Sequence, residues 1–205
     1  YRTLPQSGEK EFEFNIDALP VLLSVSKSLP KTDLYVGAQY TFAKTTVDPL
    51  FETELPDWVT TEDLDAKIAS LGIFTDWDRR DNFFTPNKGT ILHVQYAIDD
   101  NWTGSDYDYQ RLSGFANWYI PIKPKWSSAG RIDAEHVFND PPFYLLPSLV
   151  MRGVPIARYQ GATTAVIETE QRYDFNLRWS AVGFVGAGKA IMRDQSLGDA
   201  KTIIN

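Results

Sequence analysis

The chain has 205 residues and a net charge of −7, from 27 acidic and 20 basic side chains. This acidic balance argues against a nucleic-acid-binding surface, which needs a basic stripe. There is no cysteine, which excludes disulfides and thiolate metal sites and fits a secreted or outer-membrane protein.

No apolar run approaches the roughly 20 residues that a membrane-spanning helix needs. The longest run, Ala18–Val25, is interrupted by Pro20 and a serine. A membrane protein without such runs must be a closed β-barrel, because only closure pairs every backbone polar group in lipid. The mean hydropathy of −0.30 fits a barrel, since each strand alternates between an apolar and a polar face.

Apolar and polar residues alternate with a period of two along the chain, which predicts β-strands. About eight strands of roughly ten residues are expected, the length of a tilted membrane strand. In chain order they contain Phe12–Ile16, Leu34–Phe42, Ala66–Trp77, Leu92–Ile98, Leu112–Ile120, Ile132–Phe138, Ala165–Thr169 and Trp179–Ala190. Helical periodicity is scarce; only Glu62–Ala69, with Thr60 or Thr61 as a cap, allows one or two helical turns.

The links between the predicted strands alternate between short and long, as in outer-membrane barrels. The short links are Pro30–Asp33, Phe83–Gly89, Lys123–Trp126 and Asp174–Arg178, and the long ones are Val47–Asp65, Asp99–Asp106 and Asp140–Ala162. Large aromatic residues lie at or near strand ends, which is typical of membrane-interface girdles but also of ordinary β cores. They are Trp77, Trp102, Trp118, Tyr119, Trp126 and Trp179.

One predicted strand carries three charges, Arg131, Asp133 and Glu135, on a single face. Such a face needs water or mutual pairing, and a dry core excludes it. This pattern speaks against a soluble β-barrel ligand binder with a dry interior, which is one of the alternatives for this chain.

The stretch DRRDNFFTPNKG, residues 78–89, combines strand-end charges with turn residues. Asp78, Arg80 and Asp81 supply the charges, and Asn82, Pro86 and Gly89 supply the turn chemistry. Taken without any wider context, the stretch is interpreted most simply as an ordinary polar hairpin.

A second motif, Arg152-Gly153, lies in a loop at residues 141–162 that is rich in proline and aromatic residues. The loop is too apolar for a solvated loop and has too many prolines for a strand. We expect it to fold inward and pack in a barrel lumen. An inward arginine needs carboxylates for its planar guanidinium group, whereas the alternative is an ordinary surface arginine beside a turn glycine.

Together the two motifs resemble the barrel domain of the outer-membrane β-barrel assembly and surface-antigen superfamily, in which a D-x-R-D-N…P-x-x-G hairpin precedes an R-G-[FYV] loop. Within it, the chain looks most similar to the short BamA/TamA-like members that lack POTRA repeats. The resemblance covers roughly Ile68 to Lys189. It implies an all-β, antiparallel, up-and-down transmembrane β-barrel of about sixteen strands, of which this chain, as a single domain of residues 1–205, supplies the middle half.

The resemblance also implies roles for individual residues. The loop arginine of the family contacts an acidic residue on the following strand, which matches Glu170 here. The family's next strand, F-x-D-x-G, matches Phe184–Gly188, but Gly186 replaces its aspartate. Glu168 and Asp133 are the candidates to replace that carboxylate.

In function, the resemblance implies a role in inserting or translocating outer-membrane proteins or lipids, in the outer membrane of a Gram-negative bacterium. The expected partners are outer-membrane lipid and nascent outer-membrane proteins or lipids, with no nucleic acid. Both ends of the chain suggest a piece of a longer barrel. Eight strands of such a barrel leave two open edges, which either meet in a narrow barrel or pair with other strands, including those of a second copy. The bulky loop needs a wide lumen, so it favours strands that form part of a wide barrel wall over a narrow closed barrel.

An outer-membrane hydrolase is the enzymatic alternative, because such barrels can carry Ser, His and an acid at the rim. His136 has Asp133, Glu135 and Asp140 near it in sequence, and Ser127, Ser128 and Ser148 are available. No G-x-S-x-G nucleophile elbow is present. We predict no catalytic residues, no cofactor and no metal, since the spacing of the acidic stretch Asp99–Asp108 is not that of an EF-hand.

Overall fold

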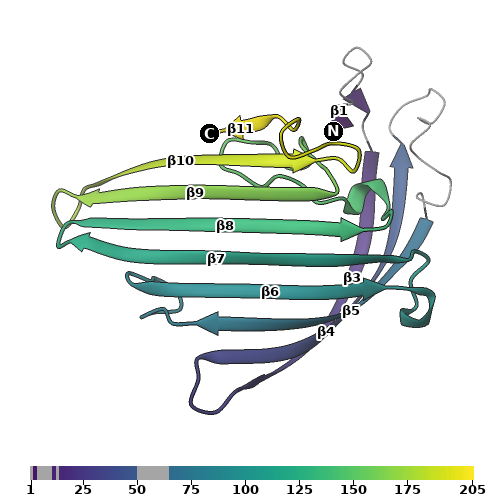
Figure 1. Ribbon diagram of the computed structural model, residues 1–205, viewed down its shortest axis with the longest axis horizontal. Helices are drawn as coiled ribbons and strands as arrows, with labels where there is room; N and C mark the ends of the chain where they lie inside the picture. Colours follow the sequence, from purple (N-terminus) through teal and green to yellow (C-terminus); the bar gives the residue numbers. More distant parts are fainter. Residues whose placement is uncertain (1, 4–10, 13, 50–64) are drawn as a thin grey trace.

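The computed structural model describes residues 2–3, 11–12, 14–49 and 65–205, and it consists mainly of one antiparallel sheet (Figure 1). Two short strands, β1 (Arg2–Thr3) and β2 (Glu11–Phe12), pair with each other. The remaining nine strands form the sheet. They are β3 (Phe14–Ser28), β4 (Leu34–Pro49), β5 (Asp65–Asp78), β6 (Gly89–Asp99), β7 (Tyr109–Lys123), β8 (Trp126–Phe138), β9 (Thr163–Asp174), β10 (Ser180–Ile191) and β11 (Thr202–Ile204).

Each strand of the sheet pairs with its neighbours in sequence, in the order β11-β10-β9-β8-β7-β6-β5-β4-β3. This confirms the predicted all-β, antiparallel, up-and-down fold. The sheet is open among the described residues, since β3 and β10 do not pair and β11 covers only Ala187–Lys189 of β10. The narrow eight-strand barrel is therefore not formed, and the wide wall is what the structure contains.

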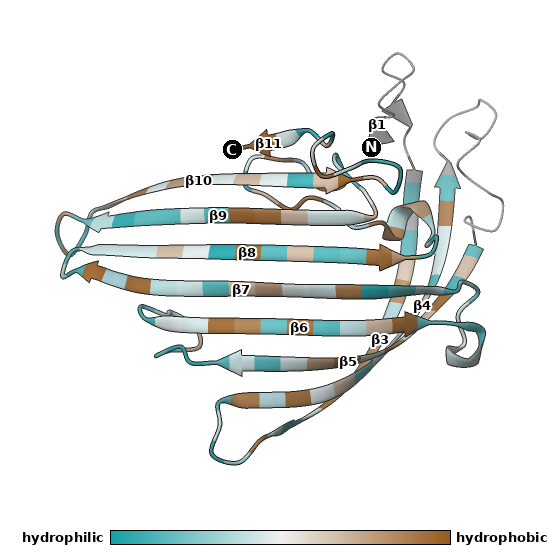
Figure 2. Ribbon diagram, viewed as in Figure 1, coloured by the Kyte–Doolittle hydropathy of each residue, from teal (hydrophilic) through white to brown (hydrophobic). Residues whose placement is uncertain are grey.

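The period-two alternation separates a polar face from an apolar one, and Figure 2 shows the two kinds of residue alternating along the strands. One face carries polar side chains, among them Asp76, Gln95, Arg111, Arg131 and Glu168. The opposite face carries exposed apolar side chains, among them Ile73, Val94, Leu112, Ile132, Ile167 and Val185. A soluble barrel would have the reverse arrangement, whereas a transmembrane barrel has a polar lumen and an apolar exterior.

Three segments differ from the prediction. β3 continues beyond the predicted strand Phe12–Ile16 and includes the apolar run Ala18–Val25, where Pro20 is tolerated because β3 is an edge strand. Residues 65–69, for which the sequence allows a helical turn, begin β5; the rest of that segment and its threonine caps lie outside the described residues, as does most of the first long link. The segment Gln195–Asn205, in which no strand is predicted, contains β11.

The described residues include two 3-10 helices, η2 (Asn101–Thr103) and η3 (Phe143–Leu145). Within the acidic stretch of that loop, Asp100 caps η2 and Asp106 Oδ2 accepts a hydrogen bond from the Lys67 N–H (2.7 Å). No helix in the described part of the chain is long and apolar enough to cross a membrane.

Candidate functional site: a loop inside the sheet

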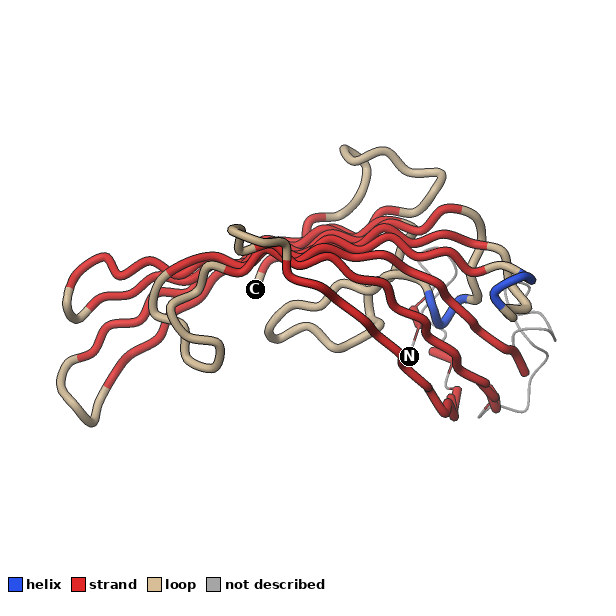
Figure 3. Tube along the Cα trace, turned by 90° about the horizontal axis from the view of Figure 1, so that it is seen from below, coloured by secondary structure: helices blue, strands red, loops and turns tan. Residues whose placement is uncertain are grey.

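The loop between β8 and β9, residues 139–162, lies beneath the concave face of the sheet (Figure 3). It is tied to itself as an irregular hairpin, since Leu149 N–H donates to the Tyr159 carbonyl (2.8 Å) and Gly161 N–H donates to the Pro147 carbonyl (3.1 Å). These bonds satisfy backbone groups that a proline-rich segment cannot pair in a regular ladder. The predicted inward loop at residues 141–162 therefore has a defined conformation on the polar side of the wall.

Apolar side chains seat this loop on β9 and β10. Leu149 (fully buried), Met151 and Val166 form a core cluster, against which Tyr159 and others pack. Gly188 of β10 makes the space, because a Cβ there would lie 2.7 Å from Met151 Sδ. A larger residue at 188 would push the loop away from the wall.

Charged side chains of the wall hold the carbonyl groups of the loop. Arg111 of β7 donates to the Leu145 carbonyl (2.6 Å), and Arg131 of β8 donates to the Val150 carbonyl (2.6 Å). Arg111 is also paired with a carboxylate on the neighbouring strand, Glu135. Charge-assisted bonds of this kind are stronger than neutral ones, so the loop is anchored by the lumen face itself.

On the far side, the loop reaches β4. The Tyr144 hydroxyl lies 2.8 Å from Thr45 Oγ1, although the two residues are 99 apart in sequence. The contact requires the sheet to curve around the loop, so the loop spans the concavity from β4 to β10.

The loop arginine, Arg152, lies on the inner side of β9 and β10. Its Nη1 is 2.6 Å from Glu170 Oε2, and its guanidinium group lies over the Phe184 ring at 4.8 Å from the centroid. The arginine side chain is 52% exposed and that of Glu170 30%, so the pair borders an open cavity of about 210 Å³. Gly153 has a φ of 74°, the left-handed conformation that favours glycine.

Glu168 anchors the backbone of the same segment. Its side chain is 9% exposed, pairs with Arg131 at 2.6 Å, and accepts hydrogen bonds from Arg152 N–H (3.3 Å) and Asn205 Nδ2 (2.6 Å). The third candidate carboxylate, Asp133, pairs with Arg131 at 3.2 Å and not with Arg152. Asp133 therefore shares Arg131 with Glu168. It does not contact Arg152, and this corrects its place among the candidate anchoring carboxylates.

The sequence motif at residues 78–89 forms a rigid hairpin end. Asp78 and Arg80 make a bidentate pair, with Nε–Oδ1 2.9 Å and Nη2–Oδ2 2.6 Å. The Asp81 carboxylate accepts from the backbone N–H groups of Asn87 (2.9 Å) and Lys88 (3.1 Å), and these bonds lower the pKa of Asp81.

The other turn residues of the hairpin act through the backbone. Asn82 Oδ1 accepts from the N–H groups of Phe84 (2.9 Å) and Thr85 (3.1 Å). Gly89 has a φ of 113°, and a Cβ there would lie 2.1 Å from the Arg79 carbonyl oxygen. Position 89 therefore tolerates only glycine. Pro86 lines a cavity that the hairpin forms with the wall.

The hairpin and the loop approach the wall on either side of Glu170. Pro86 and Asn87 share a cavity of about 130 Å³ with Tyr119, Glu170 and Arg172. Glu170 and Tyr119 also line the cavity that contains Arg152. The fold thus brings together, at one carboxylate, two motifs that are more than 60 residues apart in sequence.

The arrangement of the two histidines does not match the hydrolase alternative. His136 is on the apolar face, with Nδ1 2.6 Å from Thr163 Oγ1, whereas alternation turns Asp133 and Glu135 to the opposite face. His93 lies on the polar face with Nδ1 2.6 Å from Asp76 Oδ1, a pair that sequence reasoning missed. Only the register of β5 against β6 places these two residues opposite each other.

No group of three or more His, Asp or Glu residues in the described part of the chain is arranged to hold a metal ion.

No model of a known protein family matches the sequence, and neither does any curated protein. Among solved structures, the chain is similar to BamA from Haemophilus ducreyi, crystallised without POTRA domains 1–3, with a TM-score of 0.59 and 15% sequence identity. The match covers 88% of this chain and 42% of that one, so the chain spans less than half of the length of its structural neighbour. At this identity the similarity shows a shared outer-membrane barrel fold.

Proposed function

We propose that this chain forms part of the wall of an outer-membrane β-barrel of the surface-antigen superfamily, of the short type without POTRA repeats. In this proposal it takes part in inserting or translocating outer-membrane proteins or lipids and catalyses no reaction. It acts as a single domain in the outer membrane of a Gram-negative bacterium, with residues 141–162 as its inward-folding loop. Its partners are outer-membrane lipid and the proteins or lipids that pass through it.

The observation that carries the proposal is the contact of Arg152 with Glu170 at 2.6 Å inside a BamA-like wall. An arginine held on the lumen side by a carboxylate of the next strand fixes the loop in the path that any cargo would take. The hairpin motif lies next to the same carboxylate, so the two sequence motifs meet at Glu170. Fold alone does not establish function, so the motifs and their geometry have to support it.

A hydrolase is the weaker candidate. His136 faces the apolar exterior beside Phe138, and its hydrogen-bond partner among the described residues is a threonine and not a carboxylate. A general base needs both a nucleophile within hydrogen-bond reach and a group that orients it.

The test is an insertion assay. The chain is reconstituted in phospholipid vesicles, and a urea-denatured eight-strand barrel protein is added as the substrate. The fraction of substrate that folds is followed by its heat-modifiable mobility on gels. We expect faster folding with the chain than with empty vesicles, and a loss of this acceleration in Arg152→Ala.

The control is Arg158→Ala, which removes another arginine of the same loop that forms no ion pair among the described residues. Equal folding rates in empty and chain-containing vesicles would contradict the assembly role. Equal losses in both variants would contradict the specific role of Arg152.

A further inference from the structure

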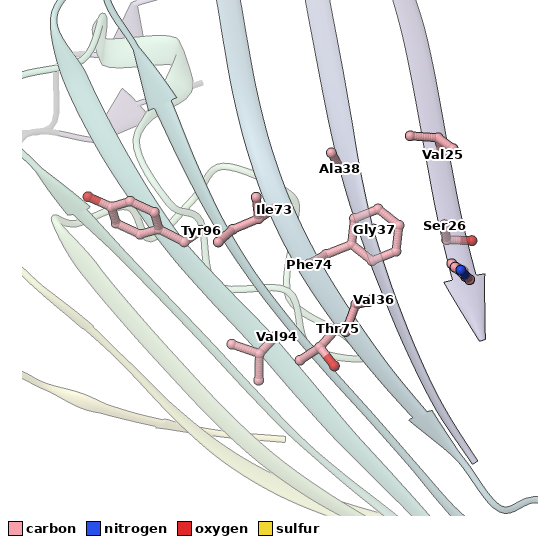
Figure 4. A pocket seen from close by; sticks show the side chains of 11 residues that line it. Val25, Ser26, Val36, Gly37, Ala38, Ile73, Phe74, Thr75, Val94 and Tyr96 are labelled. Atoms are coloured by element: carbon pink, nitrogen blue, oxygen red, sulfur yellow. The ribbon is translucent and has the colours of Figure 1, made fainter. Parts of the chain in front are cut away.

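The apolar exterior of the sheet has a hollow over strands β3 to β6 (Figure 4). The hollow has a volume of about 620 Å³, within the range of roughly 300–1,000 Å³ that is typical of small-molecule sites. Its walls carry Val25, Val36, Ala38, Ile73, Val94 and Tyr96.

Two rows of side chains account for its shape. In register across the strands, one row is Val25, Ala38, Ile73 and Tyr96, and the other begins with Lys27 and Val36. The small side chain of Ala38 lies between larger neighbours and leaves space above the sheet.

The floor of the hollow is closed on the lumen side. Gly37 of β4 has no side chain, and the Phe74 ring fills the space where its Cβ would be, at 2.3 Å from that position. The hollow is therefore separated from the polar interior and opens only to the exterior of the wall.

A hollow on this face is in contact with membrane hydrocarbon in a transmembrane barrel. Lipid tails are as apolar as the leucine and valine side chains that they touch, so the hydrophobic effect does not hold a lipid there. A lipid is held there by its fit to the shape of the hollow, because an unfilled hollow loses the dispersion contacts that a well-fitting chain supplies. The occupant that fits an open apolar hollow in this setting is an acyl chain.

Lys27 identifies the kind of lipid. It is the one charged side chain that lines the hollow, it is exposed, and it has no carboxylate partner among the described residues. It lies next to the short turn at residues 29–33, toward the end of β3 where a headgroup would be. An ammonium group in this position attracts a lipid phosphate.

We propose that the hollow binds one glycerophospholipid from the leaflet on the short-turn side, with an acyl chain against Ala38 and Ile73 and its phosphate paired with Lys27. The inference rests on the transmembrane barrel fold and is independent of the proposed assembly role.

The experiment is photo-crosslinking. The chain is reconstituted in phosphatidylcholine vesicles that contain a minor fraction of phosphatidylglycerol with a photoreactive diazirine on one acyl chain. After irradiation, the labelled residues are mapped by mass spectrometry. We expect labelling of Val36, Ala38 and Ile73 several-fold above that of exterior residues elsewhere, such as Ile132 and Ile167.

Two variants test the two parts of the site. Ala38→Phe fills the hollow and is expected to reduce its labelling several-fold. Ala116→Phe is the matched control, since Ala116 is on the same exterior face, in register with Leu92 and Ile132, and outside the hollow. Lys27→Gln is expected to reduce labelling by the anionic lipid about five-fold, and to leave labelling by an uncharged diacylglycerol probe unchanged.

Uniform labelling of the exterior, or labelling that Ala38→Phe does not change, would overturn the site. Unchanged phosphatidylglycerol labelling in Lys27→Gln would overturn the headgroup contact. Absence of lipid adducts at Val36, Ala38 and Ile73 in wild type would overturn lipid as the occupant. If Ala38→Phe does not fold, Val94→Phe fills the opposite side of the hollow and replaces it.

Discussion

Gly186 lies directly opposite Glu168 in the β9–β10 pair, so close that a Cβ at position 186 would be 2.4 Å from Glu168 Cγ. The same Cβ would be 2.7 Å from Asn205 Oδ1. The family resemblance places an aspartate at position 186. In this chain Glu168 of the neighbouring strand lies against position 186 and accepts a hydrogen bond from the Arg152 backbone N–H, and the glycine leaves room for it.

Gly186→Ala should therefore destabilise the protein, by about 1–3 kcal/mol, as is typical of overpacked sites. Glu168 cannot move freely because it is hydrogen-bonded to Arg131 and Asn205. The free energy of unfolding is measured by urea titration in vesicles. Gly183→Ala in the same strand is the control, since its Cβ would meet nothing within 4 Å, and it should leave stability unchanged or slightly raised.

Glu168→Gln should cost more stability than Glu170→Gln. Glu168 is nearly buried and accepts hydrogen bonds from Arg131, the Arg152 N–H and Asn205, so its neutralisation weakens these bonds and is expected to cost about 2 kcal/mol. Glu170 is more exposed, and solvent screening limits its expected cost to about 1 kcal/mol or less. The same urea titration ranks the two variants, and a larger loss for Glu170→Gln would show that the loop depends mainly on the arginine contact.

Arg152 and Glu170 should be energetically coupled. Because half of the arginine side chain is exposed, we expect a coupling free energy of only about 0.5–1 kcal/mol in a double-mutant cycle. Limited proteolysis should cut the loop at residues 141–162 faster in Arg152→Ala than in wild type. Protection restored by the charge-reversed pair Arg152→Glu with Glu170→Arg would support a direct contact, and additive effects of the single variants would argue against it.

The hairpin at residues 79–88 should lose order in acid. Backbone N–H groups of Lys88 and Asn87 lower the pKa of Asp81 in the folded state, so its stabilising contribution is present above the unfolded pKa and is lost as pH falls through the folded value. Amide-exchange protection at Asn87 and Lys88 should fall as the pH drops below the ordinary aspartate range. In Asp81→Asn this protection should not depend on pH in that window.

Neither histidine should support hydrolysis. His136→Ala removes the residue of the enzymatic alternative, and His93→Ala removes the one that pairs with Asp76 on the polar face. Wild type and both variants should hydrolyse ester and peptide substrates at the background rate. An activity that either substitution abolished would establish the hydrolase.

The sequence by itself determined the class of fold and most of its strands. Period-two alternation is a local property, so it can be read without knowing what a strand pairs with. It located β4 to β10 and the first residues of β3, and together with the alternating link lengths it implied an up-and-down meander with one polar and one apolar face. The pairing of Arg152 with Glu170 was implied by the family resemblance, in which the loop arginine contacts an acidic residue on the following strand.

Only the tertiary structure decided which side chains meet across the sheet. Register places His93 opposite Asp76 and Glu168 opposite Gly186, and no pattern within a single strand contains that information. Curvature brings Thr45 to Tyr144, because the bending of a sheet depends on all of its strands together. The three residues of β11 were missed for the same reason: so short a segment forms a strand only because the edge of β10 is there to pair with it.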